Sequence, residues 1–124
     1  MEAYRDRYVD LYDSAPAGYV TLDEDGYIQE INLAGASLLG RDRAELTGYP
    51  MAEYIAAHDK QVFLSHLRDC CVDRREVITE LTLISENGRS HLVQLRSVPI
   101  QFSGLDDTFC KTAIADMTPR KRTE

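Results

Sequence analysis

Apolar and polar residues along the chain follow two spacings, one typical of helices and the other of strands. The segment 2–13 has helical spacing, with polar residues on its other faces. The rest of the chain has strand patterns at both ends and helical patterns in the middle. The predicted strands are 19–22, 27–31, 77–84, 92–100 and 108–117, and the predicted helices are 33–39, 42–45, 50–55 and 59–72. This order predicts an α+β domain in which one antiparallel sheet carries its helices on a single face.

Residues with special backbone preferences mark the ends of these elements. Pro16 ends the first helix because it has no backbone N–H to donate. Gly26 supplies the positive φ angle that the turn of the first hairpin requires. Asn32, Asp42 and Asp59 stand where helices begin, and their short polar side chains suit the N-terminal cap.

The space between the sheet and the central helices is where a small ligand would bind, if the space is open. The best candidates for its apolar lining are Leu22, Leu38, Phe63, Leu67, Leu81, Leu83, Leu95 and Ile114. These residues either line a pocket or fill it, and the density of protein interiors favours filling. A charged ligand would need a buried basic partner, for which Arg96 and Lys111 are the candidates on the last three strands. Strand parity alone does not decide which face these two take.

Composition and charge narrow the classes of function. With 124 residues, 44% of them hydrophobic and 28% charged, the chain is expected to form one globular domain. The formal charge of -7 argues against nucleic-acid binding, and the basic cluster at 120–122 is expected to be a solvated linker. The sequence has no apolar run of membrane-spanning length and no export signal. We therefore expect a cytoplasmic location without direct membrane contact, unless the chain is a piece of a membrane-anchored protein.

The three cysteines do not have the spacing of a metal site, because Cys70 and Cys71 are adjacent and Cys110 stands alone. An odd number without an export signal indicates reduced thiols. One interpretation is that they are small buried apolar side chains. The other is that the adjacent pair forms a strained ring disulfide and acts as a redox switch.

Motifs of common catalytic sites are absent from the sequence. We find no glycine-rich phosphate loop, no two-histidine metal motif and no Ser-His-Asp or Cys-His arrangement. We therefore expect no enzymatic activity in this chain.

Three stretches of the sequence carry motifs that are informative when taken together. The first runs from Leu11 through the turn at 23–26 to the helix start at 31–34, and the second combines Phe-Leu-Ser-His-Leu at 63–67 with Asn-Gly-Arg at 87–89. The third is Asp-Met-Thr-Pro-Arg-Lys at 116–121. In this order and spacing they resemble the PAS family of bacterial sensor domains, over nearly the whole chain. The third stretch is similar to the family's closing Asp-Ile-Thr-Glu-Arg-Lys motif, from which Met117 and Pro119 depart.

The resemblance implies a five-stranded antiparallel sheet in the order 2-1-5-4-3 with an N-terminal flanking helix. It divides the chain into a flanking helix and linker at 1–18, a PAS domain at 19–118 and the start of a linker at 119–124. It also implies a sensor module that binds a small ligand or a partner and signals to a C-terminal output domain, such as a histidine kinase or a diguanylate cyclase. The alternative is a ligand-free module with a packed core that dimerises and relays.

The predicted first helix has a narrow aromatic stripe formed by Tyr4, Tyr8, Leu11 and Tyr12. Such a stripe must cover either the domain's own sheet or the same stripe on a second subunit. These residues are therefore the candidate interface of a homodimer.

Asp116 and Thr118 are the candidate relay residues at the end of the last strand. They lie two residues apart, so their side chains share a face of the strand. Asp116 is expected to pair with a base on a neighbouring strand, for which Arg96 is the named candidate, or to contact the backbone alone. The alternative is a purely structural role, in which the two residues only cap the end of the strand.

Haem and flavin are the cofactors that the resemblance raises. Haem-binding members of the family often use a histidine on the long helix, which makes His66 the candidate ligand and His58 a weaker one. His66 could equally be a hydrogen-bonded packing residue or face the surface. Flavin adduct chemistry lacks its nucleophile, because residues 46–50 contain no cysteine.

Overall fold

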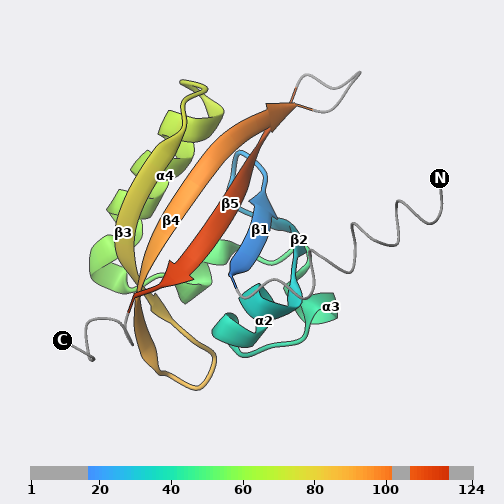
Figure 1. Cartoon of the computed structure of the whole chain (residues 1–124), viewed down its shortest axis with the longest axis vertical. Helices are drawn as coiled ribbons and strands as arrows, with labels where there is room; N and C mark the ends of the chain where they lie inside the picture. The colour runs from blue at the N-terminus through green and yellow to red at the C-terminus, as the bar shows by residue number, and fades with distance from the viewer. Residues whose placement is uncertain (1–16, 102–106, 118–124) are drawn as a thin grey trace.

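The computed structural model describes residues 17–101 and 107–117 of the chain. Figure 1 shows a sheet with helices packed against it. The strands are β1 (Gly18–Leu22), β2 (Ile28–Ile31), β3 (Val77–Ile84), β4 (Ser90–Gln101) and β5 (Thr108–Asp116). The helices are α2 (Leu33–Leu39), α3 (Arg43–Leu46) and α4 (Lys60–Cys71), and the short 3-10 turns η1 (Met51–Tyr54) and η2 (Ala57–Asp59) precede α4. The predicted elements in this range are present, and β4 is longer at both ends than the sequence pattern indicates.

Antiparallel hydrogen bonding joins the strands in the order β2-β1-β5-β4-β3, which confirms the predicted fold. β5 is the central strand, with β1 on one edge and β4 on the other. The first hairpin and the last strand therefore belong to one sheet, and β5 connects its two halves.

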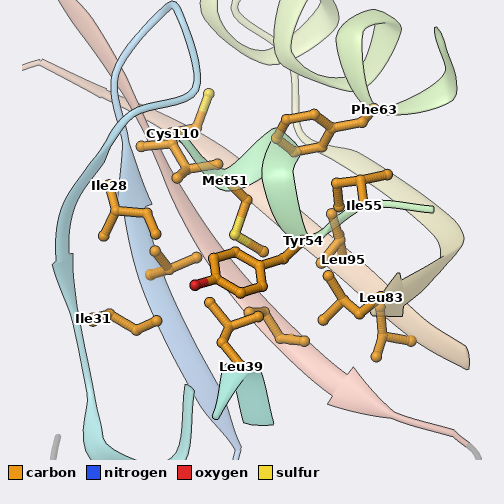
Figure 2. Close-up of a cluster of buried hydrophobic side chains, with 14 of the residues drawn as sticks. Ile28, Ile31, Leu39, Met51, Tyr54, Ile55, Phe63, Leu83, Leu95 and Cys110 are labelled. Atoms are coloured by element: carbon orange, nitrogen blue, oxygen red, sulfur yellow. The ribbon is translucent and has the colours of Figure 1, made fainter. Parts of the chain in front are cut away.

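Apolar side chains of the sheet and the helices form one core, part of which Figure 2 shows. α4 packs on β3, β4 and β5, whereas α2 lies against β1 and α3 against β2. Buried and exposed residues alternate along β4, so Val93, Leu95 and Ser97 point toward the helices. The inner face of the sheet is the face that α4 covers.

The outer face of the sheet also carries apolar side chains. Ile78 of β3 is 58% exposed and Val98 of β4 is 37% exposed. Arg96 pairs across the strands with Ile78, and Lys111 of β5 pairs with Val98, so both basic residues belong to this face. Both are exposed, and the inward orientation considered for them is wrong.

Asn32 caps α2 as predicted, because its Oδ1 atom accepts a hydrogen bond of 2.9 Å from the N–H of Gly35. Asp42 and Asp59 stand at the N-terminal ends of α3 and α4 as predicted, but neither side chain bonds to the first turn of its helix. η2 leads directly into α4, so Asp59 does not have the extended backbone of a cap. Its carboxylate instead accepts a 2.8 Å bond from the N–H of Thr82 in β3.

Several predictions concern residues outside the described ranges and stay predictions. They are the helix at 2–13 with Tyr4, Tyr8, Leu11 and Tyr12, the relay residue Thr118, and the linker at 119–124. Within 17–101 and 107–117, none of the helices is long and apolar enough to cross a membrane.

Candidate functional site

The residues predicted to face the space under α4 do lie in the core. Those that are at most 4% exposed are Leu22, Phe63, Leu67, Leu81, Leu83, Leu95 and Ile114. Figure 2 shows Phe63, Leu83 and Leu95 pointing into the same interior. Leu38 is only partly buried and packs at the margin of the core. The contact between α4 and the sheet is therefore densely filled, and a ligand-binding role for these residues stays a prediction.

A chain of hydrogen bonds crosses this apolar contact. His66 of α4 is 2% exposed, and its Nδ1 atom lies 2.7 Å from Oγ1 of Thr79 in β3. Its Nε2 atom lies 2.7 Å from Oγ of Ser97 in β4. Ser97 Oγ in turn lies 2.6 Å from Oγ1 of Thr112 in β5. One helix side chain is thus tied to three adjacent strands.

The chain of hydrogen bonds is complete with a neutral imidazole. A neutral ring has one nitrogen that donates and one that accepts, so one of the two hydroxyls accepts from the ring and the other donates to it. Burial away from water lowers the pKa of His66, and the nearby charges of Asp69 and Cys71 oppose this shift only in part. His66 is therefore neutral near pH 7 and acts as a rigid link between helix and sheet.

His66 does not fit the role of a haem ligand. Both of its ring nitrogens are within hydrogen-bonding distance of hydroxyls of the sheet, so neither is available to bind iron. His58 is 75% exposed at its side chain and lies 3.4 Å from the carboxylate of Asp59, away from the core. The alternative that His66 is a hydrogen-bonded packing residue describes its surroundings.

Three thiols meet where the end of α4 approaches β5. Cys70 and Cys110 are fully buried, and Cys71 is 4% exposed. Hydrogen bonds from the thiols of Cys110 and Cys71 lower the pKa of Cys70. Hydrogen bonds with the other two thiols, together with burial, raise the pKa of Cys110. All three are free cysteines, and the described residues contain no cluster of histidine, cysteine and acidic side chains suited to a metal ion.

The end of β5 carries a contact between a histidine and a carboxylate beside an open groove. The Nδ1 atom of His91 in β4 lies 3.4 Å from an oxygen of Asp116, with 17% and 30% of the two side chains exposed. The groove has a volume of about 670 Å³ and lies between the start of β1, α2 and the turn from β3 to β4. Leu38 and Arg89 contribute to its walls.

Asp116 does pair with a base on the neighbouring strand, but that base is His91. The expected partner Arg96 bonds instead to Glu76, with 2.6 Å between Nε and the carboxylate oxygen. The register explains the difference, because Asp116 stands opposite Val93 and Arg96 stands opposite Ala113. Arg96 is therefore three residues from the position facing Asp116 and on the other face of the sheet.

A family model described as the PAS fold matches residues 6–105. The chain belongs to the PAS family. The solved PAS domain of an HTR-like protein from Haloarcula marismortui has this fold, with 22% identity, a TM-score of 0.80 and 93% of each chain covered. The PAS domain of a protein from Colwellia psychrerythraea has 17% identity and a TM-score of 0.82, with 94% of this chain and 99% of the other covered. A PAS domain of a two-component sensor histidine kinase has 15% identity and a TM-score of 0.77, with coverage of 93% and 97%. No curated protein matches the chain.

Sequence patterns located His66 in this PAS domain but not its partners. Thr79, Ser97 and Thr112 look like ordinary strand residues, and only their shared inner face makes them a set. Strand alternation could have put them on that face, but not opposite one histidine. The approach of Cys110 to Cys70 was missed for the same reason, since it depends on how α4 crosses the sheet.

Proposed function

We propose that this PAS domain is a signal-transduction module that passes a change at the α4–sheet contact through β5 to an output domain joined at its C-terminal side. The observation that carries the proposal is the position of β5. This strand bonds to both neighbours, contacts the His66 chain at Thr112 and ends at the Asp116–His91 pair. A shift of α4 would therefore act on the same strand that leads out of the domain.

A covalently linked output domain agrees with the multidomain protein to which a similar domain belongs. One solved domain with this fold is part of a two-component sensor histidine kinase. By analogy, the domain spans 19–118, and the residues from 119 onward lead to a kinase or a cyclase. The three free cysteines fit the reducing conditions of the cytoplasm.

Replacing Asp116 in the full-length protein that contains this domain tests the relay. Asp116→Asn removes the charge of the pair but keeps the shape of the side chain, and we expect it to change the ratio of output activity with and without stimulus. Arg96→Gln is the matched control, since it breaks an exposed ion pair that is away from the exit. Unchanged signalling in Asp116→Asn would contradict the relay role. An equal effect of both substitutions would point to general disturbance of the surface charge.

The filled core favours relay without an internal ligand over a sensor that encloses one. The groove beside Asp116 favours a second candidate, a sensor that binds a small polar molecule at its surface, because Arg89 and His91 lie in its walls. Native mass spectrometry of the purified chain separates the two. A co-purified small molecule supports sensing by binding, whereas the mass of the bare chain supports relay.

Dimerisation is part of the proposed function. Ile78 and Val98 leave apolar surface exposed on the outer face of the sheet, where a second subunit can pack. The stripe of Tyr4, Tyr8, Leu11 and Tyr12 from a second subunit is the proposed cover. The double substitution Tyr8→Glu, Leu11→Glu should give a monomer in light scattering, with Arg7→Glu as a control for added negative charge. A dimer that survives the double substitution rules out this segment as the interface.

A further inference from the structure

The groove beside Asp116 is built from parts of the chain that are far apart in sequence. Its walls come from α2, from the turn between β3 and β4, and from the paired ends of β1 and β5. Figure 1 shows α2 and that turn at the end of the sheet where β5 finishes. The volume of about 670 Å³ is in the range of pockets that hold small organic molecules. The groove is therefore large enough for a ligand, and its walls indicate which kind.

Arg89 is a cation of the groove wall without a carboxylate partner. It takes part in none of the ion pairs within the part of the chain that the structure describes. Asp116 is the one acidic residue among the described wall residues, and it lies 3.4 Å from His91. Glu86 of the same turn accepts a hydrogen bond from the hydroxyl of Tyr54, which is not part of the groove. The guanidinium of Arg89 is thus available to an anion, which it can bind through two parallel N–H groups.

Asn87 adds further hydrogen-bond donors beside Arg89. Its Oδ1 atom accepts from the N–H of Arg89 at 3.1 Å and from the hydroxyl of Ser85. These bonds hold the amide by its oxygen and leave Nδ2, with its two N–H groups, to donate to a ligand. Two backbone bonds fix the turn itself, from the N–H of Gly88 to the carbonyl of Ser85 and from the N–H of Ser85 to the carbonyl of Arg89. This wall presents donors on a rigid support, which favours an anionic group over a cationic one.

The helix wall of the groove is apolar. Ala34 and Leu38 are four residues apart on α2, so they share one face of the helix, and both are half-buried. Ala17 and Ala115 add small apolar surfaces from the two strand ends. An inorganic anion on Arg89 would leave this wall in contact with water. A ligand with a short aliphatic body would cover it and gain from the burial of apolar surface.

We propose that the groove binds a small organic monocarboxylate. The carboxylate lies against Arg89 and Asn87, and the aliphatic body covers Ala34 and Leu38. The inference rests on the second candidate function, sensing at the groove, and gives the chemical class of the ligand. A bound molecule touches α2, the turn and the end of β5 together, so it would tie the helix to the strand that leads out of the domain.

Isovalerate and molecules matched to it in shape test the class of ligand. Amide chemical shifts of the isotope-labelled whole chain report the binding and its place. We expect isovalerate to shift the amides of α2 and of residues 87–91, with a dissociation constant on the order of 1 mM for so small a ligand. Isoamylamine and isoamyl alcohol should bind about tenfold more weakly, because they lack the charge that pairs with Arg89. Inorganic phosphate should also bind more weakly, because it has no apolar body.

Three outcomes of this titration would overturn the proposal. Equal binding of isoamylamine would show that Asp116 dominates the groove. Equal binding of phosphate would show that the apolar wall does not take part. Absence of shifts with every probe would show that the groove is not a site. The wild-type chain alone decides among these outcomes, whatever a variant does.

Substitutions in the two walls place the ligand. Arg89→Gln should weaken isovalerate binding about tenfold, from the loss of the charged hydrogen bonds. Ala34→Leu should also block binding, because the larger side chain fills the groove without a change in charge. Arg96→Gln is the matched control and should leave binding unchanged, since that arginine is paired with Glu76 on the outer face of the sheet. Equal losses in Arg89→Gln and Arg96→Gln would contradict a specific site.

The site and the signalling role can fail separately. Binding is measured on the purified chain and needs no output domain. If isovalerate binds through Arg89 but leaves the output of the full-length protein unchanged, the site stands and sensing at the groove is wrong. If no probe binds, the site is wrong, and Asp116→Asn still decides the relay through β5.

Discussion

His66 and Ser97 are joined across the α4–sheet contact by a 2.7 Å hydrogen bond between Nε2 and Oγ. The bond is one of a set that runs from Thr79 to Thr112 across the contact between α4 and the sheet. Apolar burial is non-directional, whereas these hydrogen bonds need the ring and the hydroxyls in one arrangement. The set therefore fixes where α4 sits on the sheet.

Replacing His66 with leucine should destabilise the domain. Leucine fills a similar volume, but it leaves the hydroxyl of Thr79 without its ring partner and shortens the chain at Ser97. We expect the free energy of unfolding to fall by about 1–3 kcal/mol, the cost of buried polar groups that lose their partners. Urea denaturation followed by circular dichroism measures the loss. His58→Leu is the control and should change stability by no more than about 0.5 kcal/mol, because that side chain is 75% exposed.

The buried imidazole should also make stability depend on pH. The folded pKa of His66 lies below the value of 6.5 that an unfolded histidine has, because burial disfavours its charged form. The unfolded chain therefore binds more protons between these two pKa values, and stability must fall as the pH drops from 6.5 toward the folded pKa.

Urea midpoints at pH 7.5, 6.5 and 5.5, on the order of one pH unit either side of the histidine pKa, measure this dependence. His66→Leu should lose less stability over this range than the wild type does, since the carboxylates contribute equally to both. Identical slopes would mean that His66 is not buried in neutral form.

Asn32 is the polar residue that secures the junction of β1 and α2. It is fully buried, and its Oδ1 accepts from the N–H groups of Tyr19 and Gly35 at 2.8 and 2.9 Å, while Nδ2 donates to the carbonyl of Ala17 at 3.1 Å. Asn32→Ala should lower the free energy of unfolding by about 2–3 kcal/mol, from the lost cap and the stranded backbone groups. Ser37→Ala on the exposed side of α2 should leave the denaturation midpoint unchanged. A small effect of Asn32→Ala would show that water replaces the amide.

The fold could be predicted because the order of elements and the turn residues depend on local sequence. Gly26, Asn32 and the Asn87–Gly88 turn act over a few residues each, and the structure has them where the pattern indicates. The partner of Asp116 depends instead on the register between β4 and β5, which is set by the whole sheet. Arg96 was the obvious basic residue on β4, but a shift of one position exchanges the two faces of a strand. The hydroxyl partners of His66 could not be predicted for the same reason, since they also depend on the register of the strands.

Coupling between α4 and the end of β5 is the claim on which the proposed function depends, and hydrogen–deuterium exchange measures it directly. His66→Gln should speed amide exchange in residues 112–116 of β5 more than in β2, because it replaces the ring that bonds to Ser97, the partner of Thr112. Leu46→Ala is the matched control, since it removes a fully buried side chain on the α3 side of the core without touching that link. Faster exchange confined to β4 and β5 in His66→Gln, and not in Leu46→Ala, is the predicted result. A uniform rise in exchange throughout the sheet in both variants would contradict a relay through β5.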